Sequence, residues 1–103
     1  MNKIEIFPAE QRVVILPEEV QEGRTPSGII IPKTVDDNKP LIGLVVASGR
    51  GSDDHPMEYV PGDIVIISTY SGVEVELNLH DHGIHTYKVV NQMDIMAKIQ
   101  GID

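Results

Sequence analysis

Prolines and glycines interrupt this chain every few residues, and no stretch between them has the apolar periodicity of a helix. The 103 residues include seven prolines and nine glycines. No segment places apolar side chains at i, i+3, i+4 and i+7 between helix-capping residues. A chain punctuated in this way forms short elements joined by turns, which favours strands over helices.

The clearest predicted strand covers residues 72–79. Four apolar residues alternate there with polar ones, the period-two pattern of a strand that is buried on one face. Other short runs are rich in β-branched residues and predict further strands. These are residues 13–16, 44–47, 64–67 and 86–90. Many short strands separated by turns predict an all-β domain, either a small barrel or a sandwich.

Length and charge narrow the function classes. A chain of 103 residues suggests one domain, and its formal net charge is −8 with no run of basic residues. This acidity argues against nucleic acid or an anionic membrane as the main partner. The absence of cysteine excludes disulfides and thiol chemistry. Without an apolar stretch near the ~18 residues of a membrane span, or a signal-type segment, we expect a cytoplasmic protein.

Both ends of the chain alternate like strands, at residues 3–7 and 93–99. Terminal strands readily become sheet edges, and an unpaired edge invites another chain. If the two ends pair between neighbouring subunits, a head-to-tail ring results. Pairing within one chain is the alternative, and the residues alone leave both open.

Residues 18–40 have the composition of a loop, although structureless connections beyond ~12–15 residues are uncommon unless they are functional or disordered. An apolar triplet in the middle of this span is either a short buried strand or an exposed segment kept for a partner. Apolar triplets are more often core, but the flanking Gly and Pro and the acidic pair that follows keep the second interpretation open. The residues concerned are Gly28, Ile29, Ile30, Ile31 and Pro32.

Six short motifs follow one another in an order that resembles the chaperonin-10 family, the co-chaperonins that cap chaperonin-60 rings. Any one of them is weak, but six in order over nearly the whole chain argue against chance similarity. They are Arg-Val-Val-Ile at 12–15, Ser-Gly-Ile-Ile-Ile-Pro at 27–32 with Lys39-Pro40 downstream, Gly-Leu-Val-Val-Ala-Ser-Gly at 43–49, Pro-Gly-Asp-Ile-Val at 61–65, Tyr-Ser-Gly-Val-Glu-Val at 70–75 and Met-Asp-Ile-Met-Ala at 93–97.

The resemblance implies a small, irregular, partly open β-barrel of the GroES-like type, in a single domain over residues 1–103 with a long mobile loop at 18–40. It implies a homoheptameric ring, and therefore favours pairing of the termini between neighbours. The partners would be a chaperonin-60 (GroEL-type) ring and the unfolded substrate proteins enclosed under the cap. ATP would be bound by the chaperonin partner, so this chain needs no cofactor. The docking residues would be Gly28, Ile29, Ile30, Ile31 and Pro32.

The chain departs from the family pattern at its start and in the region expected to form the roof of the cap. Gln11 stands where the family usually has Asp before the Arg. Residues 49–62 are shorter than the usual roof hairpin and predict a tight turn, which implies a thin or open roof. These differences suit a divergent or phage-encoded member.

An insertion after residues 75–77 carries His80, His82 and His85, with Asp81 as a further possible ligand. His80 and His82 would share one face of a strand, so a small metal-binding β-protein is the alternative function. A polar hairpin turn around Gly83 is the simpler interpretation, because short His-x-His clusters bind metals incidentally. No serine lies in a nucleophile-elbow context and no phosphate-binding loop is present, so we expect no enzyme activity.

Overall fold

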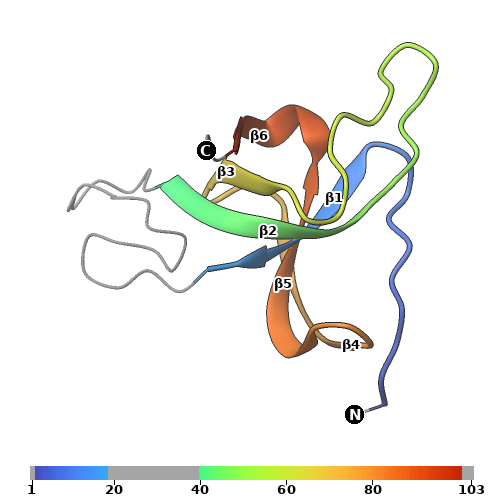
Figure 1. Cartoon of the computed structure of the whole chain (residues 1–103), viewed down its shortest axis with the longest axis vertical. Helices are drawn as coiled ribbons and strands as arrows, with labels where there is room; N and C mark the ends of the chain where they lie inside the picture. The colour runs from blue at the N-terminus through green and yellow to red at the C-terminus, as the bar shows by residue number, and fades with distance from the viewer. Residues whose placement is uncertain (1, 19–39, 101–103) are drawn as a thin grey trace.

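The computed structural model describes residues 2–18 and 40–100. In these residues six strands form one antiparallel sheet with the order β4-β5-β1-β2-β3-β6 (Figure 1). The elements are β1 (Arg12–Pro17), β2 (Pro40–Ser48), β3 (Ile64–Ser68), β4 (Val73–Leu79), β5 (Gly83–Asn91), the 3₁₀ turn η1 (Gln92–Asp94) and β6 (Ile95–Ile99). The prediction of an all-β fold is confirmed, and the runs predicted at 13–16, 44–47, 64–67, 72–79 and 86–90 correspond to β1 to β5.

Strand β1 is the centre of the sheet. It pairs with β2 along one edge and with β5 along the other. Val13, Val14 and Ile15 are each 0% exposed. Because successive side chains of a strand point to opposite faces, both faces of β1 must be covered. The sheet therefore has an apolar cluster on each side.

The larger cluster draws on five of the six strands. The sheet must curl to bring side chains from β5 through β6 into one core, and two register irregularities allow it to bend. These lie between Val14 and Ile15 in the β1–β2 ladder and between Ile66 and Ile67 in the β3–β6 ladder. The two edge strands, β4 and β6, are not neighbours in the sheet order of the described residues, so the barrel is open between them. The buried members are Val13, Ile15, Val45, Val65, Ile67, Val90 and Ile95.

The smaller cluster lies on the opposite face of β1. Val14, Leu79 and Tyr87 are its buried members. Half-buried apolar side chains from β2, β4 and β5 surround them, and Ile6 of the N-terminal segment packs against the same cluster. Val75, Leu77 and Leu79 of β4 face this cluster, which explains most of the alternation seen in the sequence, while Val73 is exposed.

The prediction of a strand at residues 3–7 is wrong beyond a single residue. Ile4 forms an isolated parallel bridge with Leu79. The Ile4 N–H donates to the Asn78 carbonyl at 2.9 Å, and the His80 N–H donates to the Ile4 carbonyl at 2.9 Å. After Ile4 the segment leaves this edge, because Ile6 packs into the smaller cluster beside β2.

The predicted strand at residues 93–99 is shorter than expected. The Asn91 side chain accepts a hydrogen bond from the Met93 N–H at 2.9 Å, which caps η1 and delays the strand to Ile95. β6 then pairs with β3 of the same chain, so one of its edges is already occupied. Both terminal segments therefore have partners within the chain.

Gly72, which immediately precedes β4, provides a test of this packing. Its φ is +69°, and a Cβ there would lie 2.2 Å from the Val89 carbonyl oxygen. We expect Gly72→Ala to lower the free energy of unfolding by more than the roughly 1–3 kcal/mol of backbone strain alone, because the added methyl also meets β5. The measurement is urea unfolding of the purified protein.

Gly83→Ala is the matched control for this prediction. Gly83 has a φ of +81° but nothing within 4 Å of an added Cβ. Its substitution should therefore lower the free energy of unfolding only by the backbone strain of a positive φ. Equal losses in the two variants would contradict the close approach of Gly72 to β5.

Candidate functional site

The predicted docking segment is attached to the sheet at the ends of β1 and β2. Pro17 lies opposite Gly43 in the β1–β2 ladder, and the Glu18 N–H donates to the Ile42 carbonyl at 2.8 Å. The chain thus leaves and re-enters the sheet on adjacent antiparallel strands (Figure 1). The predicted docking residues lie outside the described residues, and their role stays a prediction. They are Gly28, Ile29, Ile30, Ile31 and Pro32.

The point of attachment is itself part of a three-stranded unit. Pro40 lies opposite Ser68, and Leu41 lies opposite Ile67 in the β2–β3 ladder. Ile42 and Ile67 are both buried. β3 therefore holds the return strand from Pro40, where it begins, and β1 joins it on the other side from Gly43.

A buried lysine lies close to this attachment point. Lys88 is 3% exposed, pairs across the ladder with Ile15, and donates from Nζ to the Thr69 carbonyl. A shallow hollow beside it is lined by Pro17 and Leu41, among others. The burial of Lys88 is not predicted above. The sequence does contain an indication of a buried charge. Lys88 is a single charged residue between Tyr87 and two valines, in a run otherwise typical of a buried strand.

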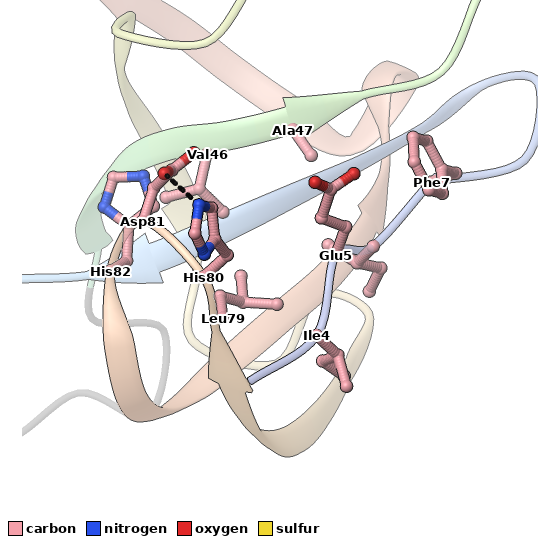
Figure 2. A pocket seen from close by; sticks show the side chains of 10 residues that line it. Ile4, Glu5, Phe7, Val46, Ala47, Leu79, His80, Asp81 and His82 are labelled. Atoms are coloured by element: carbon pink, nitrogen blue, oxygen red, sulfur yellow. Dashed lines mark ion pairs between the residues drawn. The ribbon is translucent and has the colours of Figure 1, made fainter. Parts of the chain in front are cut away.

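The histidine-rich insertion forms the turn between β4 and β5. β4 ends at Leu79, so His80 and His82 lie in the turn. The prediction that they share one face of a strand is therefore wrong. His80 Nε2 lies 3.8 Å from Asp81 Oδ1, and both side chains are exposed. Figure 2 shows this pair at the rim of a hollow between the turn, the N-terminal segment and β2.

His85 does not join the other two histidines. It lies on β5 and stacks edge-on against Tyr87, with ring centroids 5.8 Å apart. Within residues 2–18 and 40–100, no group of three His, Cys, Asp or Glu side chains could hold a metal ion. The insertion has the geometry of a polar hairpin turn, and nothing in it favours the metal-binding alternative.

Tyr87 connects the turn of this hairpin to the smaller cluster. Its hydroxyl donates to the Gly83 carbonyl at 2.7 Å, and its ring is fully buried in the smaller cluster. Burial raises the pKa of the Tyr87 phenol above its usual value of 10.0, because the charged form would lose its solvation. The phenol thus remains a hydrogen-bond donor at neutral pH.

Comparison with known proteins places these features in one family. The family model described as the chaperonin 10 Kd subunit matches residues 5–99. The chain belongs to the chaperonin-10 family. The match includes the strands of the described sheet and also the segment between β1 and β2.

Curated relatives cover nearly the whole chain. The co-chaperonin GroES of Phocaeicola vulgatus is 42% identical over 92 residues, which is 89% of this chain and 94% of that protein. The co-chaperonin GroES of Streptomyces albus G is 34% identical over 103 residues, covering 96% and 94%. That of Porphyromonas gingivalis is 38% identical over 94 residues, covering 91% and 98%. These matches support a co-chaperonin role in a non-enzymatic family.

Two departures from the chaperonin-10 motifs can be placed in the structure. Gln11 precedes β1, and its side chain donates to Ser52 Oγ at 2.9 Å. In the region at 49–62, which is predicted to be shorter than the usual roof hairpin, Gly51 and Pro56 form an isolated antiparallel bridge, and the Ser52 N–H donates to the His55 carbonyl at 3.0 Å. Gln11 and this turn are therefore in direct contact.

The structure also bears on membrane association. No helix in the described residues is long and apolar enough to cross a membrane.

Proposed function

We propose that this chain assembles into a ring that caps a chaperonin-60 (GroEL-type) ring through residues 28–32, and so assists the ATP-dependent folding of enclosed proteins. The observation that carries the proposal is the family match over residues 5–99, which includes this apolar segment. The relatives are named co-chaperonins. In this proposal ATP is hydrolysed by the partner, and the chain acts in the cytoplasm without catalysis or a cofactor of its own.

Attachment of the segment to adjacent strands supports a docking role. The register between Pro17 and Gly43 holds the two ends together, so residues 19–39 can order on a partner without a change in the sheet. Burial of three Ile side chains is worth about 4.5–9 kcal/mol gross. Ordering a flexible segment costs about 2–5 kcal/mol of this. One segment therefore binds weakly.

A ring would convert weak contacts into useful affinity. Once one segment is bound, binding of the others is effectively intramolecular, and avidity can add a factor of about 10²–10⁴. Each single contact stays weak enough to be released when the partner changes conformation. Weak docking segments on a ring therefore suit reversible capping.

Exposed apolar side chains near both termini support assembly of the ring. Phe7 of the N-terminal segment is 82% exposed, and Met96 of β6 is 60% exposed. β6 uses one edge to pair with β3, and it is the last strand in the described sheet order. An edge strand with exposed apolar side chains is a surface for another chain. A seven-membered ring is the size that the family resemblance implies.

The first prediction from this proposal concerns native mass. We expect about seven times the 11.3 kDa of one chain by analytical ultracentrifugation. Met96→Lys should shift the population towards monomer, because a charge on the exposed edge strand opposes pairing. Val60→Lys is the matched control, since Val60 is exposed to a similar degree but lies outside the strands. A concentration-independent monomer in the unmodified protein would contradict the ring.

The second prediction concerns Ile30→Ser, at the centre of the apolar triplet. If the triplet is exposed until it docks, the free energy of unfolding should change by no more than about 0.5 kcal/mol. Binding to chaperonin-60 with nucleotide should fall steeply, because each segment loses roughly 1.5–3 kcal/mol and the loss is repeated around the ring.

Thermal unfolding and chaperonin-60 binding should be measured on the same preparations, with Ile84→Ser as the control. Ile84 is an exposed isoleucine at the β4–β5 hairpin, so its substitution should alter neither quantity appreciably. A destabilised Ile30→Ser protein that still binds chaperonin-60 would reject the docking role.

A further inference from the structure

The turn at residues 51–58 has little apolar contact to hold it against the sheet. Residues 52–56 at its tip are all exposed, and within 51–58 Met57 packs in part against the larger cluster, followed by Tyr59 just beyond the turn. Backbone bonds fasten its start, where the Gly51 N–H donates to the Glu10 carbonyl at 2.8 Å. Among the described residues, two glutamine side chains add further hydrogen bonds between the turn and the body.

Gln92 contacts the returning arm of the turn. It is only 3% exposed, although a primary amide must have hydrogen-bond partners to be buried without a large cost. Its Oε1 accepts from the Glu58 N–H at 3.1 Å. Its Nε2 donates to Gln11 Oε1 and lies 3.3 Å from the His55 carbonyl and 3.4 Å from the Pro56 carbonyl. Both ends of this amide are therefore occupied.

Gln11 contacts the tip of the turn from the other side. Its Nε2 lies 2.9 Å from Ser52 Oγ and 3.1 Å from the His55 carbonyl. Ser52 Oγ also accepts from the His55 N–H at 3.2 Å. The backbones of the two glutamines are also hydrogen-bonded to each other, because the Gln92 N–H donates to the Gln11 carbonyl at 2.7 Å. The two amides thus link the turn to the start of β1 and to η1.

The arrangement requires carboxamides and not carboxylates. An amide presents a donor and an acceptor from one planar group, whereas an ionised carboxylate only accepts. A carboxylate at position 92 could still accept from the Glu58 N–H. Its second oxygen would face three acceptors, on Gln11, His55 and Pro56, in a buried place.

We propose that Gln11 and Gln92 form an amide latch that keeps the 51–58 turn closed, and that this turn opens as a unit while the sheet stays folded. Opening breaks the latch hydrogen bonds and uncovers little apolar surface. The strands carry the buried clusters, so they are unaffected. Local openings of this kind, with a lower cost than global unfolding, are measurable by amide hydrogen exchange.

The test is native-state hydrogen exchange on the assembled protein at neutral pH, with Gln92→Met as the variant. Methionine has a similar length but can supply none of the amide's hydrogen bonds. We expect exchange at the Gly51 and Glu58 amides to accelerate at least about tenfold, since several hydrogen bonds are lost together. The exchange rates of amides in β1 and β5 should stay within about twofold of those in the unmodified protein. Gln100→Met, at an exposed glutamine outside the latch, should change neither set.

Two glutamate variants test the donor requirement. Gln92→Glu should accelerate exchange at Gly51 and Glu58 at least as much as Gln92→Met, because it places charge against buried acceptors. Gln11→Glu should have a smaller effect, since that carboxylate can still accept from Gln92 and from the Ser52 hydroxyl.

Two results would overturn the latch. One is unchanged exchange at Gly51 and Glu58 in Gln92→Met. The other is an equal acceleration in β1 and β5, which would make Gln92 a support of the whole sheet. If Gln92→Met does not fold, Gln11→Ala replaces it, because Gln11 is only half-buried. Exchange at Gly51 and Glu58 is again compared with exchange in β1 and β5, and the same two results would overturn the latch.

Discussion

Burial of β1 on both faces is the constraint on which the other features depend. Val13, Val14 and Ile15 have no exposed surface, and β2 and β5 occupy the two edges of the strand. A strand enclosed in this way can shift only if both apolar clusters are disrupted, which ties its position to the global stability of the domain. Its end at Pro17 is therefore a fixed attachment point for the segment that we propose to dock.

The strands could be predicted because their side-chain patterns record local burial. The alternation in β4 and the β-branched runs of β1 and β3 mark which faces are covered, and the sheet confirms them. Residues 3–7 alternate in the same way but bridge at Ile4 only. Alternation shows that one face is apolar, but it does not show whether a neighbouring backbone continues alongside. Packing of the partly buried Ile6 against the smaller cluster decides the path of that segment, and this depends on tertiary contacts.

The polar contacts could not be predicted in the same way. Lys88 and Gln92 are buried because carbonyl oxygens from distant parts of the chain lie within reach of their donors, at Thr69 and near the 51–58 turn. Sequence spacing does not reveal such approaches. The histidines of the insertion show the converse, because His80 and His85 are close in sequence yet belong to a turn and to a strand. The docking residues were predicted by family resemblance, and the sheet shows only where their segment is attached.

In the function that we propose, residues 29–31 contact chaperonin-60 while the sheet serves as a rigid support. Amide exchange of the free ring, and of the ring with chaperonin-60 and ATP, tests it most directly. We expect rapid exchange at Ile29, Ile30 and Ile31 in the free ring, strong slowing on addition of the partner, and no change in β1. Slow exchange at these residues in the free ring, or complex formation that leaves their exchange unchanged, would contradict the claim.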